Sequence, residues 1–567
     1  MTKRVRLILG GLMIASAAAS AKTGPAIWAV NDGEKIKQDA LDHPAQRGNS
    51  VWDGTLIRLF GARNETVAFQ VIVPAPDRAV TVQAVTLTFP SSALGVEILS
   101  EHYIPIGKPT NDDEHGGWFW YKAAAPKDCT GLIPDALVPL TAKAGRGGLP
   151  LAIARGRQQG FWVDVAIPRS GLGAGNVKGA LAVRTDAGAI EIPVVVEVLD
   201  ATLPDEDAVK TMVYMSDIER RHGRKDEMLK RAYRFMAHRH RFDTAESLGF
   251  DEYPAFKPYL TGEAFTSAQG YVGPGEGLGL KVFGVGFYGA VGKETKQELW
   301  KKFDREAAWF VANAPKTLPF IYLTDEPGKD MMAWCRERGD WIHANPGPGG
   351  RLPVFVTTKP RPELEGAIDI YATVADNVYL DQLPRERAKG RRWWFYNGMR
   401  PMSGAITTDA PAVDVRVQPW ICWKEGVELW FYWESTHWQH NHQGPRAHQD
   451  QNVWRDPLTF VGGDAEVNGD GTLFYPGEDV KFPDQDRGIP GPISSIRMKN
   501  LRRGQQDVAY LELAKAAGHE AEARAIVAKL IPRAFSAAKP GQPVSWPESG
   551  APWDAARRDL AGLITRD

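Results

Sequence analysis

Two adjacent carboxylates, Asp325 and Glu326, follow a short apolar run after one threonine and precede Pro327. Hydrolysis of a glycosidic bond usually needs one protonated carboxyl at the leaving oxygen and a second group that supplies a nucleophile or activates water. In the substrate-assisted variant, the 2-acetamido group of the sugar is the nucleophile. One carboxylate then orients and stabilises the acetamido nitrogen while its neighbour protonates the leaving oxygen, so an adjacent pair suits this chemistry.

The pair lies where a predicted strand ends, because residues 320–323 read Phe-Ile-Tyr-Leu. Neighbouring side chains on a regular strand point to opposite faces, so both carboxylates reach one pocket only if the strand twists or ends there. Pro327 lacks a backbone donor and disfavours helical geometry at Glu326, which favours such an end. The same three residues are also compatible with a solvated turn that opens the next helix.

Aromatic residues gather downstream, where eight of the nineteen tryptophans fall between Trp393 and Trp454. Aromatic rings offer an apolar face with a polar edge, which fits a pyranose ring and its hydroxyls. For Trp393, Phe395 and Trp430 we predict packing in the core. The predicted sugar-binding residues, which include those nearest the strand ends, are Trp394, Tyr396, Asn397, Trp433, Glu434 and His437.

Four histidines follow the second aromatic run, at His437, His440, His442 and His448. Imidazoles this close together could bind zinc. Because neither a helical spacing nor a CxxC-type pair accompanies them, we instead predict a polar rim loop that hydrogen-bonds sugar hydroxyls, and no metal site.

A glycine-rich segment at residues 284–289 matches the letters of the dinucleotide-binding fingerprint. That fingerprint needs a helix that begins at the third glycine within a βαβ unit. Here the next predicted helix starts several residues later, so we interpret the glycines as a bend at a strand of the second domain. We predict that the protein uses no cofactor.

The periodicity of the sequence predicts a multidomain β plus α/β protein. Residues 25–199 alternate with a period of two between Gly- and Pro-rich turns, as around Val67 and Val163, which is typical of an antiparallel β-sandwich. A polar, proline-marked linker follows at residues 200–207. The predicted domains are therefore a leader at 1–21, a sandwich at 22–203 and a second domain at 204–567.

In the second domain, short apolar runs alternate with helical patterns, among them predicted helices at 226–237, 295–312 and 331–343. About eight strands are expected, and a (β/α)8 TIM-type barrel is the economical way to close them. Its active site would lie at the carboxyl ends of the strands, where Asp325 and Glu326 are found. The Ala-, Glu- and Lys-rich tail at residues 508–563 predicts helices that pack outside the barrel.

The formal net charge is −1, so no electrostatic excess favours nucleic acid or an anionic membrane. Residues 3–6 are basic, residues 7–19 are apolar, and Ala19-Ser20-Ala21 follows, which predicts a cleaved export signal and no membrane span. We expect a periplasmic or extracellular protein. Its three cysteines, Cys129, Cys335 and Cys422, are too few and too far apart for a disulfide framework.

Four segments together resemble the catalytic domain of glycoside hydrolase family 123, and the similarity extends from about residue 207 to about residue 518. They are residues 322–327, 393–398, 469–477 and 495–504. The resemblance implies an N-terminal sandwich and an exo-β-N-acetylgalactosaminidase that acts by substrate assistance. It also implies that Asp325 polarises the acetamido group and that Glu326 is the acid/base. The substrate would then be a glycan or glycoconjugate.

Two other functions stay open from the sequence. One is a non-catalytic carbohydrate-binding protein that keeps the aromatic pocket, and the other is a related exo-glycosidase that acts on another sugar, because a fold does not fix the substrate.

Overall fold

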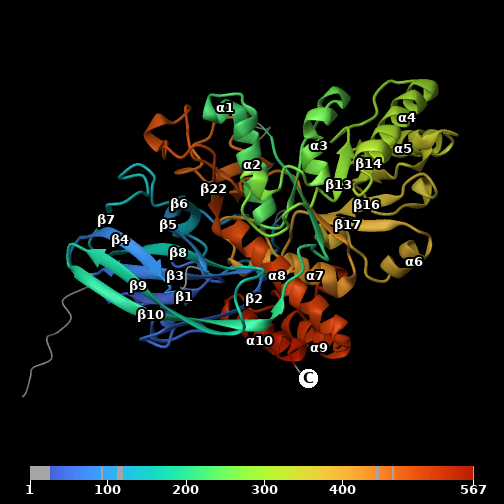
Figure 1. Cartoon of the computed structure of the whole chain (residues 1–567). Coiled ribbons are helices and arrows are strands. Elements are labelled where there is room, and N and C mark those ends of the chain that lie inside the picture. Colours follow the sequence, from blue (N-terminus) through green and yellow to red (C-terminus); the bar gives the residue numbers. More distant parts are fainter. Residues whose placement is uncertain are drawn as a thin grey trace, which may run out of the picture.

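The computed structural model describes residues 26–90, 93–110, 119–216, 218–440, 446–462 and 465–565, and the predicted leader at 1–21 lies outside these ranges. Figure 1 shows two packed β-sheets beside a second part in which strands and helices alternate, with the long helix α8 between them. None of the described helices combines the length and the apolar character that a membrane-spanning segment requires.

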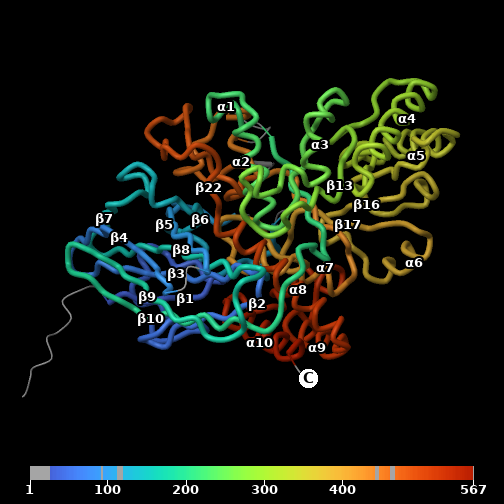
Figure 2. Tube along the Cα trace, in the orientation of Figure 1, coloured from blue at the N-terminus to red at the C-terminus, as the bar shows by residue number. Residues whose placement is uncertain are grey.

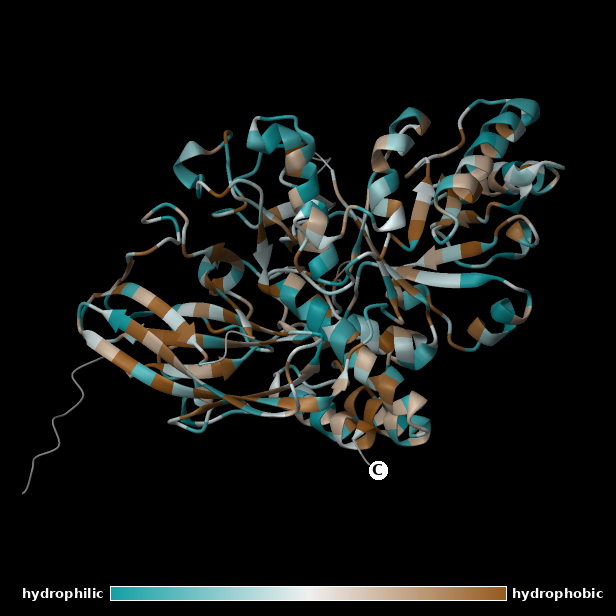
Figure 3. Cartoon of the chain, in the orientation of Figure 1, coloured by the Kyte–Doolittle hydropathy of each residue, from teal (hydrophilic) through white to brown (hydrophobic). Residues whose placement is uncertain are grey.

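The N-terminal part is a β-sandwich with an apolar core between its sheets, as predicted. Val67, Phe69, Val71 and Val73 are buried in this core, and Figure 3 shows hydrophobic and hydrophilic residues alternating along the strands. The first sheet contains β1 (Trp28–Asn31), β3 (Glu65–Ala75), β8 (Arg157–Ile167), β5 (Gly95–Ile106) and β6 (Gly131–Pro139), in that order. The second contains β2 (Ile57–Arg63), β10 (Gly188–Thr202), β9 (Gly175–Thr185), β4 (Val80–Thr88) and β7 (Leu151–Ile153). The ladders are antiparallel with one exception, β10 beside β2, which is parallel.

The first sheet of the sandwich is completed by a segment from far along the chain. β22 (Pro492–Ser495) pairs antiparallel with β6, with Ser494 opposite Leu137, and β21 (Tyr475–Pro476) pairs with β22. Figure 2 shows this orange segment beside β5 and β6. The chain passes from the first part to the second near residue 203. In the folded molecule, however, a strand from the second part joins a sheet of the first.

Eight parallel strands form a third sheet, with the order β12-β11-β18-β17-β16-β15-β14-β13. All eight predicted strands are present: β11 (Lys210–Tyr214), β12 (Asp243–Ala245), β13 (Val282–Val285), β14 (Leu318–Thr324), β15 (Val354–Val356), β16 (Ile370–Thr373), β17 (Arg392–Tyr396) and β18 (Leu429–Tyr432). The sheet curls into a nearly closed barrel. Its two end strands are bridged where the backbone N–H of Lys281 donates to the Asp243 carboxylate over 2.8 Å.

Helices connect most of these strands. They are α1 (Ile218–His222), α2 (Glu227–Arg239), α3 (Tyr253–Thr261), α4 (Lys296–Asn313), α5 (Met332–His343), α6 (Leu383–Ala388) and α7 (Val413–Glu425). The connection from β15 to β16 holds only a 3-10 turn, Pro362–Leu364. The three helices predicted from the sequence are present. Side chains that cap the N-terminus explain where two of them, α2 and α4, begin. Asp226 caps α2, and Thr295 and Glu298 form a capping box at the start of α4.

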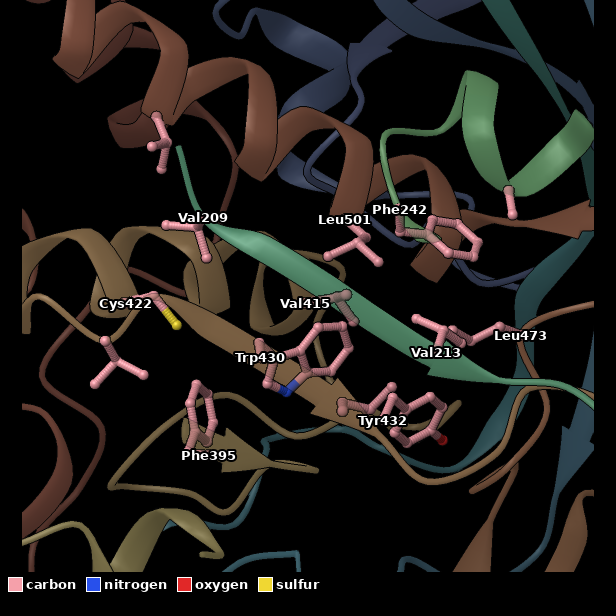
Figure 4. Packing of buried hydrophobic residues seen from close by; sticks show 14 of the residues in the cluster. Val209, Val213, Phe242, Phe395, Val415, Cys422, Trp430, Tyr432, Leu473 and Leu501 are labelled. Carbon is pink, nitrogen blue, oxygen red and sulfur yellow. The ribbon is translucent and has the colours of Figure 1, made fainter. Parts of the chain in front are cut away.

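The barrel strands are buried on both faces. Phe320, Tyr322, Trp394 and Phe431 pack together inside the barrel, whereas their neighbours in sequence face the covering helices. Figure 4 shows Trp430 and Tyr432 on this outer face, near residues such as Val415 and Leu501. The predicted core packing of Trp393, Phe395 and Trp430 is confirmed.

Helix α8 (Ile496–Ala516) departs from the prediction for the tail. It begins before residue 508, and it is buried on all sides for most of its length instead of lying on an outer surface. At Gly504 a Cβ would stand 2.4 Å from the carbonyl oxygen of Arg416 in α7, so glycine permits the close packing of these two helices. The helices α9 (Glu520–Leu530) and α10 (Ala551–Ile564) then pack against α8.

Cations on α8 pair with carboxylates of the sandwich. Lys499 and Arg502 both donate to Asp164 of β8, over 2.8 and 2.6 Å, and Arg503 donates to Asp32 over 2.9 Å. Burial alone raises the pKa of a carboxyl, but the charges of Arg502 and Lys499 hold the pKa of Asp164 well below its usual value of 3.8. The contact between the two parts of the molecule is therefore a buried ionic network.

We predict that Asp164→Asn lowers the free energy of unfolding by about 3–5 kcal/mol, because the buried Arg502 loses its carboxylate and Lys499 keeps only Glu97. The pKa of Asp164 is lower in the folded than in the unfolded chain. Its stabilising effect is therefore complete above about pH 4 and is lost as the pH falls through the folded-state pKa. The midpoint of urea unfolding, measured at several pH values, tests both statements.

A matched control is Arg524→Gln, which breaks an exposed pair with Glu520 on α9. Such a pair contributes less than about 0.5 kcal/mol. Equal shifts of the unfolding midpoint in the two variants would contradict a special role for the buried network.

Candidate active site

A cavity of about 760 Å³ opens at the carboxyl ends of the barrel strands. Asp325 and Glu326 line it from the end of β14, Tyr396 and Asn397 from the end of β17, and Trp433 from the end of β18. Of the predicted site residues, the structure therefore brings these five together around one space. The tertiary arrangement is the one expected for an active site of a barrel protein.

The two carboxylates share the cavity because the backbone turns at Glu326. This residue has a φ of 39°, in the left-handed region that non-glycine residues rarely adopt. The strand ends at Thr324, so the pleat no longer forces Asp325 and Glu326 to opposite faces. Both side chains are exposed to the cavity. Strained backbone of this kind is common where surrounding contacts over-determine a functional site.

Hydroxyl groups orient the two carboxylates. Tyr322 and Thr357 donate to Oδ1 of Asp325, over 2.7 and 2.8 Å. The Thr357 hydroxyl also accepts a hydrogen bond from the backbone N–H of Glu326, so one side chain holds both members of the pair. The Tyr396 hydroxyl donates to Oε1 of Glu326 over 2.6 Å. Burial and the Glu326 charge raise the pKa of Tyr396 well above 10, so its phenol stays protonated as a donor.

Trp433 forms an aromatic wall that is held from behind by Asp470. Its indole Nε1 lies 3.0 Å from Oδ2 of Asp470, and the Tyr432 hydroxyl lies 2.9 Å from Oδ1. Burial raises the pKa of Asp470 to about 6, although the hydrogen bonds from Trp433 and Tyr432 lower it. The backbone N–H of Trp433 also donates to the side chain of Asn397, over 3.3 Å.

Three predicted sugar-binding residues do not line the cavity. Trp394 is 1% exposed and packs inside the barrel against Phe320 and Phe355. Side chains alternate between the two faces of β17, and that of Trp394 points into the barrel below the cavity. Glu434 is buried and accepts hydrogen bonds from the backbone of Ser435 and Thr436 and from Ser216. His437 lies behind the wall, with its ring 5.2 Å from that of Trp433.

The buried position of Glu434 gives it a supporting role. Burial raises the pKa of this carboxyl to about 7, although the hydrogen bonds from Ser216, Thr436 and Ser435 lower it. Because Ser216 follows β11 and Glu434 follows β18, their contact joins two neighbouring strand ends. Glu434 therefore braces the loop after β18, and it does not line the cavity.

Several cavity residues escaped the sequence analysis. Thr357 and Lys359 follow β15 and were open to the same strand-end argument that identified Asp325. Tyr288, with a φ of 63°, comes from the glycine-rich segment 284–289, which begins in β13 and continues beyond its end. Asp470 belongs to the segment 469–477 that carries part of the family resemblance, but it is far from any barrel strand in sequence. Only the fold places it at the cavity.

The histidine loop forms no metal centre in the part that the structure describes. No group of three or more His, Cys, Asp or Glu side chains stands close enough to hold a metal ion among the described residues. His442 lies outside the described ranges. His440 has its Nε2 3.8 Å from an oxygen of Asp456, which also pairs with Arg446.

Comparisons with known proteins agree with this geometry. The sequence model for the catalytic domain of glycoside hydrolase 123 matches residues 297–514. A solved structure of a family 123 glycoside hydrolase from Clostridium perfringens, described for glycolipid glycan hydrolysis, aligns with a TM-score of 0.61. It is 13% identical in sequence, and the alignment covers 95% of this chain and 97% of that one. A β-glucuronidase from Parabacteroides merdae aligns at 12% identity over 65% of this chain and 45% of its own, with a TM-score of only 0.23. No curated protein matches the chain.

We predict that Thr357→Val lowers kcat about tenfold or more on a chromogenic glycoside, since the change leaves the Glu326 backbone N–H unpaired and frees Asp325. Tyr322→Phe should cost less, because it removes a single bond to Asp325. Thr357→Ser keeps the hydroxyl and should retain most of the activity. A Thr357→Val enzyme with unchanged kcat, or one that is no slower than Tyr322→Phe, would contradict the joint positioning of the pair.

Proposed function

The chain belongs to glycoside hydrolase family 123 and is a glycoside hydrolase, and from this we propose that it removes terminal β-linked N-acetylhexosamine, with N-acetylgalactosamine as the sugar. The proposed mechanism is substrate-assisted and retains the anomeric configuration. We also propose that the nearly closed eight-stranded sheet is a (β/α)8 barrel, which the bridge between its end strands supports, and that the protein is exported, which its first 21 residues support. One observation carries the mechanism: two adjacent carboxylates enter one cavity with different hydrogen-bond partners.

Asp325 is suited to the acetamido group. Both hydroxyl donors bind its Oδ1, and no described residue donates to its Oδ2. The free oxygen can accept the N–H of a bound 2-acetamido group. Positive charge develops on that nitrogen as the acetamido oxygen attacks the anomeric carbon, so the carboxylate stabilises the transition state more than the ground state.

Glu326 is suited to proton transfer. It gives a proton to the glycosidic oxygen as the bond to the anomeric carbon breaks, and the acetamido oxygen takes the place of the leaving group. In the second half it accepts a proton from water, which attacks the anomeric carbon and restores the acetamido group. The Tyr396 hydroxyl on Oε1 fixes the rotamer of the carboxyl and leaves Oε2 toward the substrate. Two displacements at the same carbon give overall retention.

The walls of the cavity suit a single sugar ring. Trp433, Tyr288 and Phe431 supply aromatic area, while Asn397 and Asn377 supply amide groups for hydroxyls. The family resemblance supports N-acetylgalactosamine as the sugar. The alternatives from the sequence are an exo-glycosidase for another sugar and a binding protein without catalysis. Release of 4-nitrophenol from matched chromogenic glycosides separates all three.

For Asp325→Asn we predict a fall in kcat of about 100-fold or more with a much smaller change in ground-state affinity. A substrate with a plain 2-hydroxyl should be almost inert on the wild type, and an N-acetyl thiazoline should inhibit competitively. Asp330→Asn, an exposed carboxylate that does not line the cavity, is the matched control. A 2-fluoro glycosyl ester trapped on any carboxylate of the wild type would mean a conventional protein nucleophile and would exclude this role for Asp325.

For Glu326→Gln we predict that kcat falls about 100-fold or more on glycosides with poor leaving groups, because proton donation to the leaving oxygen is lost. Activated aryl glycosides need less protonation and should lose less. Glu363→Gln, on the exposed turn after β15, is the control. Equal losses on both kinds of substrate would argue that Glu326 has a structural role instead.

A further inference from the structure

Two cations, Lys359 and Arg361, line the same cavity as the catalytic pair. They follow β15 and are separated by Pro360, which disfavours helical geometry at Lys359. Arg361 is extended, with φ −136° and ψ 147°. Residues two apart on an extended segment point to the same side, so the local backbone presents both cations to the cavity together.

Neither cation has a carboxylate within ion-pair distance among the described residues, but Asp376 is near enough that burial raises its pKa while the Lys359 charge lowers it. The Lys359 ammonium lies 3.3 Å from Oδ1 of Asn377 and 3.2 Å from the Tyr379 hydroxyl, both of which are neutral. The guanidinium of Arg361 makes no hydrogen bond to any described residue, and its Nε is buried. Leaving a buried charged donor unpaired is unfavourable, so such a group in a binding cavity points to a ligand that completes it.

The catalytic carboxylates do not pair with these two cations. Asp325 and Glu326 are held by Tyr322, Thr357 and Tyr396, and no ion pair joins either of them to Lys359 or Arg361 in the described chain. Lys359 also holds its loop against the 375–379 segment through Asn377 and Tyr379, whereas the Arg361 guanidinium makes no hydrogen bond to a described residue. Their charge is therefore available to a bound molecule.

A second cavity, of about 500 Å³, adjoins this side of the site. Asp376 and Tyr379 line it, while their neighbour Asn377 lines the catalytic cavity. Lys359 hydrogen-bonds both Asn377 and Tyr379, so it stands at the boundary between the two spaces. A glycan that continues beyond the released sugar could pass this boundary.

We propose that Lys359 and Arg361 form a subsite for an oxyanion, and that the substrate is an acidic glycan with a sulfate ester or a carboxylate close to the scissile bond. This inference rests on the proposed function and adds the substrate class to it. Guanidinium and ammonium groups bind sulfate and carboxylate through charge-assisted hydrogen bonds. The anion belongs either to the released sugar, as a sulfate, or to the next sugar, as the carboxylate of a uronic acid.

Two sets of substrates distinguish these sources. The first compares 4-nitrophenyl β-N-acetylgalactosaminide with its 4-O-sulfate and its 6-O-sulfate. The second compares N-acetylgalactosamine β-linked to glucuronic acid with the same sugar β-linked to glucose. We expect kcat/KM of the wild type to favour an acidic substrate over the neutral one in at least one set by about tenfold or more, and this preference to weaken as ionic strength rises.

Arg361→Gln and Lys359→Gln should each reduce the acidic-to-neutral ratio of kcat/KM severalfold, and Arg361→Lys should retain part of it. Arg385→Gln is the matched control, because Arg385 is exposed on α6 and lies outside both cavities. Hydrolysis of the neutral substrates without preference for any acidic one would overturn the subsite and leave the proposed function standing. A preference that survives in both glutamine variants would also overturn it. If none of the N-acetylgalactosaminides is hydrolysed, the proposed function fails, and this inference fails with it.

Discussion

The buried ionic contacts between helix α8 and the sandwich hold the rest of the molecule in place. Arg503 reaches Asp32, and Lys499 and Arg502 share Asp164. Charges removed from water in this way are stable only when their geometry is well matched, so the network tolerates few relative positions of the two parts. A sandwich that moved away would leave cations buried without partners. This explains why α8 is buried on all sides although its sequence is rich in charge.

The same helix reaches the active site through Arg497. Its guanidinium bonds to Asp135 of the sandwich over 2.8 Å, and it donates to the carbonyl of Gly469 over 2.7 Å. The loop that contains Gly469 carries Asp470, which holds the indole of Trp433 at the wall of the cavity. A continuous set of hydrogen bonds therefore leads from the sandwich to the predicted sugar-binding surface. The sandwich is a structural part of the site, and its Phe119 also lines the cavity.

The carboxylate pair includes a residue with strained backbone that contacts from other strands hold in place. The left-handed backbone at Glu326 is unfavourable by itself, and it is held by Thr357, which follows β15, and by Tyr396 at the end of β17. Asn397 and Tyr288, which also line the cavity, adopt the same unusual backbone region. The floor of the cavity is a set of strand ends that turn abruptly, and each turn delivers a polar or aromatic side chain that a regular strand would point elsewhere.

The sequence by itself determined most of the elements and the position of the adjacent carboxylates. Periods of two and of helical spacing are local properties, so the sandwich strands, the eight barrel strands and helices such as α4 could be predicted from them. Asp325 and Glu326 could be found because carboxylates directly after a barrel strand lie at the carboxyl end of the barrel. Asn397 and Trp433 could be found by the same argument.

Only the tertiary structure decided which aromatic and acidic side chains face the cavity. Trp394 and Tyr396 lie on the same face of β17, and the depth of each along the barrel axis, which the sequence does not encode locally, sends one into the core and the other to the cavity. Glu434 was misplaced for a related reason, since a turn after the strand directs it beneath the site. Three features depend on contacts between residues far apart in the chain: the pairing of β22 with the sandwich, the burial of α8 and the position of Asp470 at the cavity. A local sequence pattern does not predict such contacts.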